Sequence, residues 1–393
     1  MVHEKGLRPG VRRRVRLAHL TDCHVACDGK ATAVLKNRSI EILHDLVDQL
    51  LDRAVDAVLL GGDNIDNRGS GERDLDAFVH AIDRLPRAYC VVGNHEAVTS
   101  RSGRVTKTQF AARLHGRGIS TRRFNFWTVV GDVRVIGIDT TVIGATGGRV
   151  SPHTLRFLSR CLGEATEPHV VVVGHHLLRR TWAPHHLARW DEEYLVSNWE
   201  QVVALLLQYP NVRAYLCGHH HASSIQRIGP DGASHGPDTS DASNVSNGFY
   251  HILTPSPAAY PHVARILEFD DSGIHVSALR PRLTGLMEAG LAAVLSGRKA
   301  RRFATVSDTD GFLRYIAGRP DENDVFLPHN AGPSSVSFAN LATSVVSARP
   351  QDAASRGGGG GGGGSVSAVT QPAVMSAACD GGMFDPDTEF HDP

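Results

Sequence analysis

The sequence predicts an α/β fold, and two alternating patterns carry this prediction. Short apolar runs that end in Gly or a polar residue are typical of buried strands. Between them lie segments with apolar residues at three- and four-residue spacing, separated by charges, as in amphipathic helices. Alternation of strand and helix indicates layers packed on a sheet. In the N-terminal part the expected strands are 15–20, 57–60 and 89–92, and the expected helices are 40–51 and 75–85.

The rest of the main domain contains more strand than helix. Residues 129–138 hold two β-rich runs separated by Gly131-Asp132, which indicates a hairpin. The later runs follow one another closely, so we expect the second half to be more antiparallel than the first. The expected strands are 170–173, 212–217, a run near Ile225, 250–253, 263–269 and 274–279, and the expected helices are 152–162 and 199–208.

Changes in composition predict three regions along the chain. Residues 1–280 form the main domain, and residues 281–327 form a C-terminal helical extension with helices at 286–295 and 311–317. Residues 328–393 are rich in Gly, Ser, Ala and Pro and include eight consecutive glycines, Gly357 to Gly364. Such a composition cannot bury enough apolar surface to fold, so we predict a disordered tail.

Charge and hydropathy exclude several classes of partner. Lys+Arg and Asp+Glu are equal at 41 each, so no global field draws the protein toward nucleic acid or an anionic membrane. The chain has no apolar run of about 18 residues or more, and its N-terminus lacks the apolar core of a secretory signal. Its 6 cysteines form no Cys-x-x-Cys pair. These features predict a cytoplasmic protein in a reducing compartment, without a membrane partner.

Clusters of Asp, Asn or His follow five of the expected strands. In an open α/β sheet the carboxyl ends of the strands line one crevice, so these clusters are expected to converge. The glycines beside them allow the sharp turns that are needed where a strand breaks off. The clusters are Asp22-Cys23-His24, Gly62-Asp63-Asn64-Ile65-Asp66, Gly93-Asn94-His95-Glu96, Gly174-His175-His176 and Gly218-His219-His220-His221.

Spacing within the clusters indicates which side chains face a common point. Side chains alternate in an extended segment, so Asp22 and His24 are expected on one side with Cys23 on the other. His219 and His221 repeat this spacing, with His220 on the other side. The candidate ligands offer both oxygen and nitrogen atoms and are too many for one tetrahedral ion but suitable for two. These seven candidates are Asp22, His24, Asp63, Asn94, His175, His219 and His221.

The ordered set Asp-x-His, Gly-Asp-x-x-Asp, Gly-Asn-His-Glu, Gly-His-His and Gly-His-x-His resembles the signature of calcineurin-like metallophosphoesterases. Each motif alone is weak, but all five occur in order over about residues 14–280. The chain is most similar to the bacterial cyclic-nucleotide and glycerophosphodiester phosphodiesterase-like group. This resemblance implies that residues 1–280 are a catalytic domain. It also implies a four-layer αββα sandwich of mixed sheets, with a metal site at the carboxyl ends of the strands.

The resemblance further implies two divalent metal ions, with Asp63 bridging them. Mn, Fe and Zn all suit ligands of these types. One ion is then bound by Asp22, His24 and His221. The other ion is bound by Asn94, His175 and His219.

His95 is the catalytic side chain that the resemblance implies. It would donate a proton to the leaving oxygen or stabilise the phosphoryl transition state. Asp66 and Glu96 would support the ligands from behind. The implied activity is hydrolysis of a phosphodiester or phosphomonoester of a small organic or nucleotide substrate by attack of a metal-bound hydroxide.

Alternatives stay open within the family. One is a catalytically silent metal-binding scaffold. Another is a protein phosphatase, because Asp66-Asn67-Arg68-Gly69 partly matches the Asp-Arg-Gly of those enzymes. Purple acid phosphatases carry an iron-binding Tyr at the position of Asp66, which argues against a purple centre. The balanced charge argues against a nuclease and a nucleic-acid partner. A homodimer is possible because members of the family often dimerise.

Three further groups of residues have both a functional and a purely structural explanation. For His176, contact with the substrate and support of the ligands both stay open. A solvated loop explains His185-His186, between Trp182 and Trp190, better than a substrate cap does. The basic run 298–302 is better explained by a solvated helix end than by a phosphate or nucleic-acid site.

Overall fold

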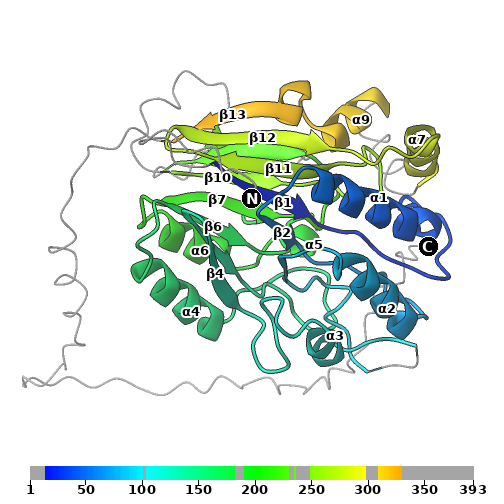
Figure 1. Cartoon of the computed structure of the whole chain (residues 1–393), viewed down its shortest axis with the longest axis horizontal. Coiled ribbons are helices and arrows are strands. Elements are labelled where there is room, and N and C mark those ends of the chain that lie inside the picture. The colour runs from blue at the N-terminus through cyan, green and yellow to red at the C-terminus, as the bar shows by residue number, and fades with distance from the viewer. Residues whose placement is uncertain are drawn as a thin grey trace, which may run out of the picture. The chain divides into compact units, whose positions relative to one another are not determined.

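Two mixed β-sheets lie at the centre of this protein, as Figure 1 shows for the computed structural model. The structure describes residues 14–100, 103–181, 190–229, 234–235, 248–297 and 309–329, all within one compact unit. In these ranges the first sheet has six strands, in the order β13 (Asp324–Pro328), β12 (Gly273–Leu279), β11 (Ala264–Phe269), β1 (Val15–Leu20), β2 (Ala57–Leu60) and β3 (Ala88–Cys90). The second has seven, in the order β4 (Phe126–Val130), β5 (Val133–Gly137), β6 (His169–Val173), β7 (Val212–Cys217), β10 (Phe249–Leu253), β8 (Ser224–Ile228) and β9 (Ser234–His235).

Strand direction determines where the functional loops emerge. β1, β2 and β3 run parallel in the first sheet. β5, β6, β7 and β10 run parallel in the second sheet. The strands β8, β11, β12 and β13 pair only in antiparallel ladders. β10 is parallel to β7 and antiparallel to β8. The second half is therefore more antiparallel, as predicted, while the carboxyl ends of the parallel strands are grouped at one edge of each sheet.

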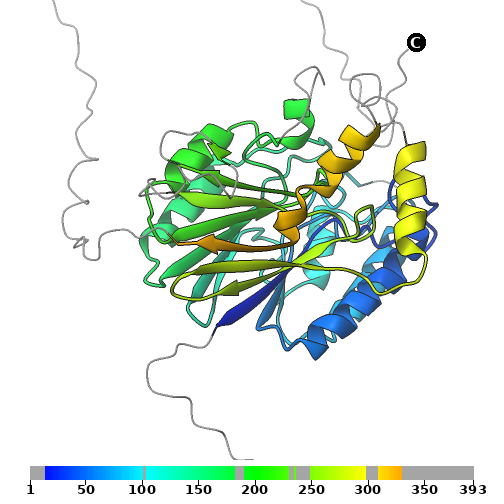
Figure 2. The ribbon, with the colours of Figure 1, turned by 90° about the horizontal axis from the view of Figure 1, so that it is seen from above.

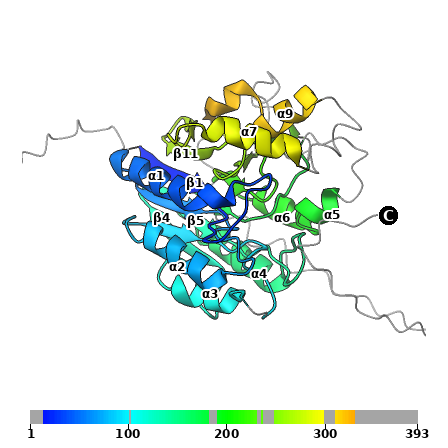
Figure 3. The same cartoon turned by 90° about the vertical axis from the view of Figure 1, so that its right-hand side faces the viewer.

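Helices cover the outer faces of both sheets and give four layers, which Figure 3 shows edge-on. This arrangement confirms the predicted αββα sandwich. α1 buries Ile42, Leu43, Leu46 and Leu50, the three- and four-residue spacing from which the helix was predicted. One side carries α1 (Ser39–Asp52), α2 (Gly71–Ile82) and α3 (Lys107–Arg113). The other side carries α4 (Pro152–Gly163), α5 (Trp190–Tyr194) and α6 (Trp199–Leu206).

β6 shows why the central strands are continuous apolar runs. Val171 and Val173 belong to the core between the sheets, together with Leu17 of β1. Val170 and Val172 point the other way, into the core beneath α4 and α6. Because successive side chains of a strand face opposite sides, a strand that is covered on both faces needs apolar residues at every position.

Most predicted elements are present, and the omissions have physical reasons. α2 begins at Gly71 rather than Leu75, because its first turn carries the polar residues Glu72 and Asp74. α3 was not predicted, although Thr106 and Gln109 form a capping box at its start. α5 was also missed, since its five residues are too few for a periodic pattern.

The predicted C-terminal extension contains more than helices. α7 (Leu286–Ser296) and α9 (Thr309–Ala317) match the predicted helices. A 3-10 turn, Pro320–Asn323, then leads into β13, which forms the edge of the first sheet beside β12. The disordered tail was predicted for residues 328–393, but Pro328 is the last residue of β13; the rest of the tail beyond residue 329 and the basic run 298–302 lie outside the described residues. No helix in the described ranges has the length and apolar character that crossing a bilayer requires.

Candidate metal centre

The structure brings together all eight side chains that the sequence predicted for the site. Each lies on a loop that directly follows a parallel strand, so the sheets position them from two sides. The first sheet supplies Asp22 and His24 after β1, Asp63 after β2, and Asn94 and His95 after β3. The second sheet supplies His175 after β6, and His219 and His221 after β7.

Asp22, His24 and His221 form the first ligand group, with one ligand atom of each within 4.8 Å of the others. The Nε2 atoms of His24 and His221 are 3.0 Å apart, and Asp22 Oδ1 is 3.2 Å from His221 Nε2. Two imidazole nitrogens and one carboxylate oxygen thus converge on one point. This is a donor set that Zn²⁺, Mn²⁺ or Fe²⁺ accepts.

Asp22 is oriented through one oxygen, which leaves the other for a ligand. Its Oδ2 accepts hydrogen bonds from the Thr21 hydroxyl at 2.7 Å and from the His219 backbone N–H at 2.8 Å. Its Oδ1 is buried and makes no hydrogen bond. A buried carboxylate oxygen without a hydrogen-bond donor is costly, and a bound cation would remove that cost.

The second ligand group surrounds His175. Asn94 Oδ1 lies 3.1 Å from His175 Nε2, and the rings of His175 and His219 are 4.8 Å apart between centroids. His175 Nδ1 donates to the Gly61 carbonyl at 2.9 Å, so Nε2 is the nitrogen left for a metal. His219 Nε2 donates to the Glu193 carbonyl at 2.8 Å, which leaves Nδ1. Each imidazole therefore has a backbone partner that fixes its tautomer.

Asp63 lies between the two groups. Its carboxylate comes within 4.8 Å of ligand atoms of Asp22 and His24 from the first group and of His175 from the second, and of His95. Its Oδ1 accepts the His95 backbone N–H at 2.9 Å and is 3.4 Å from His175 Nε2. This is the position that a bridging carboxylate requires.

His95 stands at the mouth of the centre. Its Nδ1 donates to the Asp66 carbonyl at 2.8 Å, so Nε2 faces the site, 3.9 Å from Asp63 Oδ2. The Arg68 guanidinium lies 3.5 Å from that nitrogen. The Asp66 carboxylate pairs with the buried Lys36 ammonium at 2.7 Å, and its Oδ1 lies 4.0 Å from Nδ1 of the candidate ligand His24.

The backbone of the ligand loops is not extended, so one predicted reason for convergence was wrong. β1 ends at Leu20 and β7 at Cys217, before the ligands begin. A non-glycine residue in the left-handed region costs about 1–3 kcal/mol and is held there by its surroundings. Of the eight non-glycine residues with positive φ in the described ranges, five are predicted ligands: Asp22, His24, Asp63, His219 and His221.

Glu96 fixes two of these loops at once. Its buried carboxylate accepts four backbone N–H groups, from Asp63 at 3.0 Å, Asn64 at 2.7 Å, Ile65 at 3.1 Å and Gly93 at 2.7 Å. Burial, and then the charge of Asp63, raises the pKa of Glu96 to about 7, while the N–H donors oppose that rise. One side chain thereby ties the loop after β2 to the loop after β3.

The ligands are held mostly in the protonation states that metal binding requires. Burial lowers the pKa of His24 and of His219 well below the usual range, so both imidazoles are neutral. Burial alone would raise the pKa of Asp63, but the neighbouring histidines, His175 first, hold it well below its usual range. Burial would lower the pKa of His175, yet Asp63 raises it to about 9. Below about pH 9, a metal that binds His175 must therefore displace a proton.

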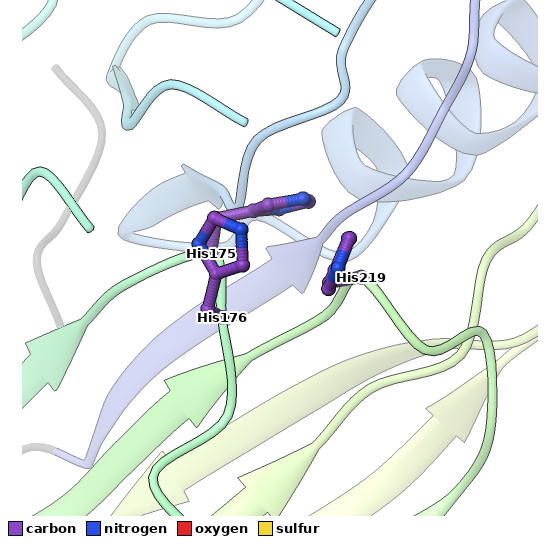
Figure 4. Close-up of side chains that lie close together, drawn as sticks. All are labelled: His175, His176 and His219. Atoms are coloured by element: carbon purple, nitrogen blue, oxygen red, sulfur yellow. The ribbon is translucent and has the colours of Figure 1, made fainter. Parts of the chain in front are cut away.

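His176 lies against the second ligand group, as Figure 4 shows with His175 and His219. Its two ring nitrogens are bonded to the Thr140 hydroxyl at 2.8 Å and the Thr146 carbonyl at 2.9 Å. The side chain is fully buried. Both ring nitrogens are therefore engaged within the fold, which favours support of the ligands and of the loop that begins at Thr140 over contact with the substrate. His185 and His186 lie outside the described residues.

These residues fit a pair of divalent cations. The centre has imidazoles, carboxylates and an amide oxygen, together with the unbonded Asp22 Oδ1. Such a donor set at strand ends of an αββα sandwich defines a metal-dependent phosphoester hydrolase. The sequence profile described as Calcineurin-like phosphoesterase matches residues 15–223, more than half of the chain. The chain belongs to the calcineurin-like phosphoesterase family.

Comparison with known proteins gives relatives of two kinds. The chain is 25% identical over 218 residues to the 3',5'-cyclic adenosine monophosphate phosphodiesterase CpdA of Escherichia coli (strain K12), covering 53% of this chain and 70% of the relative. It is 28% identical over 132 residues to the DNA double-strand break repair protein Mre11 of Methanosarcina mazei, covering 33% of this chain and 20% of the relative.

Solved structures with the same fold include two phosphatases. A dimetal phosphatase from Danio rerio superposes with a TM-score of 0.52 at 17% identity, covering 68% of this chain and 96% of that one. The purple acid phosphatase PPD1 of yellow lupin superposes with a TM-score of 0.51 at 16% identity, covering 70% of this chain and 52% of that one. At this identity the likeness shows the shared fold.

Glu96→Gln tests whether this carboxylate holds the ligand loops. The substitution replaces one acceptor oxygen by an N–H donor, so two of the four backbone N–H groups lose their partner. We expect the free energy of unfolding to fall by about 3 kcal/mol, measured by urea denaturation of the metal-free protein at pH 8. The matched control is Glu288→Gln on the exposed face of α7, with a change of about 0.5 kcal/mol or less. Equal, small changes in both variants would contradict the role of Glu96.

Proposed function

We propose that this chain hydrolyses a small phosphodiester, such as a nucleotide or an organic phosphodiester, at a two-metal centre. The observation that carries the proposal is the convergence of ligands from both sheets on the shared Asp63 carboxylate. The similarity to CpdA, whose name records a cyclic-nucleotide phosphodiesterase, supports a diester as the substrate. One ion would be held by Asp22, His24, Asp63 and His221. The other would be held by Asp63, Asn94, His175 and His219.

The exposure of the side chains indicates where the substrate approaches. The side chains of Asp22 and His175 are inaccessible, whereas that of His221 is 22% exposed and that of His95 is 12% exposed. Arg68, at 35%, is the most open of this group. The substrate would therefore enter on the side of His95, His221 and Arg68, where it meets the Arg68 guanidinium.

The chain's own groups each have a task in this proposal. When bound, two divalent ions would supply positive charge for the phosphoryl oxygens and would lower the pKa of water. His95 Nδ1 donates to the Asp66 carbonyl, so Nε2 carries a proton only when the ring is an imidazolium. Burial lowers the pKa of His95, and we propose that the imidazolium forms as the anionic substrate binds and then delivers its Nε2 proton to the leaving oxygen. The Arg68 guanidinium, beside that nitrogen, binds a phosphoryl oxygen and orients the ester for the transfer.

Removal and return of the metal tests the proposal. Wild type and Asp63→Ala are stripped with a chelator and assayed with bis(p-nitrophenyl) phosphate and p-nitrophenyl phosphate, before and after Mn²⁺ is added. We expect Mn²⁺ to restore turnover in wild type and in the exposed control Asp52→Ala, but not in Asp63→Ala, with the diester preferred. Preference for the monoester would shift the assignment to a phosphatase. A wild type that binds Mn²⁺ but turns over neither compound would support the silent scaffold instead.

His95→Gln tests the proton transfer. Loss of a general acid lowers kcat by about 10²–10⁴-fold when the leaving group is a poor one. The loss should be much smaller for p-nitrophenolate, which leaves without protonation, and the Mn²⁺ content should not change. The exposed His115→Gln is the control. An equal loss with good and poor leaving groups would show that His95 stabilises charge on the phosphoryl group rather than donating a proton.

A further inference from the structure

The C-terminal segment, residues 309–328, is bonded directly to the loop that carries two of the candidate ligands. Figure 2 shows β13, in orange, between the green strands of the second sheet and the yellow-green strands of the first, with the orange helix α9 beyond the strand ends. The loop in question is Gly218-His219-His220-His221, which joins β7 to β8. Two separate anchors connect the segment to this loop.

The first anchor holds His220, between the two candidate ligands. Its ring is buried between two tyrosines, at 4.2 Å between centroids from Tyr194 of α5 and 5.5 Å from Tyr315 of α9. The Tyr315 hydroxyl is hydrogen-bonded to His220 Nε2 and, at 3.0 Å, to the Thr181 hydroxyl. The two ring contacts and the hydrogen bond restrict rotation of the His220 side chain and so restrain the loop on both sides of it.

The second anchor follows the ligands by two residues. The Ser223 backbone N–H donates to the Ile316 carbonyl of α9 at 3.0 Å. The buried Glu322 carboxylate accepts the Ser223 hydroxyl at 2.9 Å and the Ile225 N–H at 3.2 Å. Arg265, fully buried on β11, donates to the Glu322 carbonyl and the Ser223 hydroxyl at 2.6 Å each. This network ties the end of the ligand loop to the C-terminal segment and to the first sheet.

We propose that Tyr315 and Glu322 are positioning residues for the metal centre, and that the C-terminal segment sets the metal affinity through these two anchors. The proposal rests on the proposed two-metal function. His219 and His221 have φ values of 71° and 56°, a backbone conformation that is costly without external support. The two anchors supply that support at His220 and at Ser223. The Tyr315 hydroxyl acts on His220 and the Ile316 carbonyl acts on the Ser223 backbone, so their effect reaches a metal through the loop, while Tyr194 also lies against the His219 ring at 5.3 Å between centroids.

The test compares two tyrosines that both bind through their hydroxyl groups near this segment. Tyr315→Phe removes the hydroxyl that holds His220 and keeps the ring. The matched control is Tyr250→Phe, which removes a hydroxyl that donates to the Pro328 carbonyl of β13 at 3.0 Å, without contact with the ligand loop. Mn²⁺ dissociation constants are measured by titration calorimetry on the chelated full-length chain, with thermal unfolding of the metal-free protein in parallel.

We expect Tyr315→Phe to weaken Mn²⁺ binding about tenfold, which is the lower end of the effect seen when a residue that orients a metal ligand is removed. Its turnover should recover at saturating Mn²⁺, and Tyr250→Phe should bind like wild type. Unchanged binding in Tyr315→Phe would overturn the proposal, as would equal weakening in both variants, which indicates general loosening. If Tyr315→Phe does not fold, Glu322→Gln takes its place under the same criteria. A wild type that binds no Mn²⁺ would refute the proposed function itself, an outcome distinct from these.

Discussion

The metal centre depends on two hydrogen bonds that join the sheets where their parallel strands end. The His219 backbone N–H, after β7, donates to Asp22, after β1, at 2.8 Å. His175, after β6, donates to the Gly61 carbonyl, after β2, at 2.9 Å. Each candidate ion takes ligands from both sheets, so neither site exists within one sheet alone. The packing between the sheets therefore sets the distance between the ligands, and close-packed interiors yield little to strain.

Buried polar side chains hold the ligand loops in conformations that these loops would not keep on their own. Four backbone N–H groups converge on Glu96, and the loop beyond β7 is fixed through Tyr315 and Glu322. Five ligands in left-handed conformations require such support. The surrounding hydrogen bonds offset the local cost because they form only when the loops take this conformation. Rigid ligands with fixed tautomers bind a metal with little reorganisation, which is what preorganised catalysis requires.

Residues that act through their own chemistry were predictable from the sequence, whereas residues that act through packing were not. The strand-end position of Asp63 or His175 follows from apolar runs that stop at a polar cluster, and the structure confirms their convergence. The left-handed backbone of Asp22 has no sequence signal, because aspartate also occurs in extended segments. Tyr315 lies far along the chain from His220. The contact between them depends on β13 joining the first sheet, and no local sequence pattern predicted this strand.

The central claim is that Asp63 is shared by two ions, and electron paramagnetic resonance of the Mn²⁺-reconstituted protein tests it most directly. The account predicts that the chelated chain takes up two Mn²⁺ ions and that their spectrum shows exchange coupling through the common ligand. Uptake of one ion only, or of two ions with the independent spectra of isolated Mn²⁺, would contradict it.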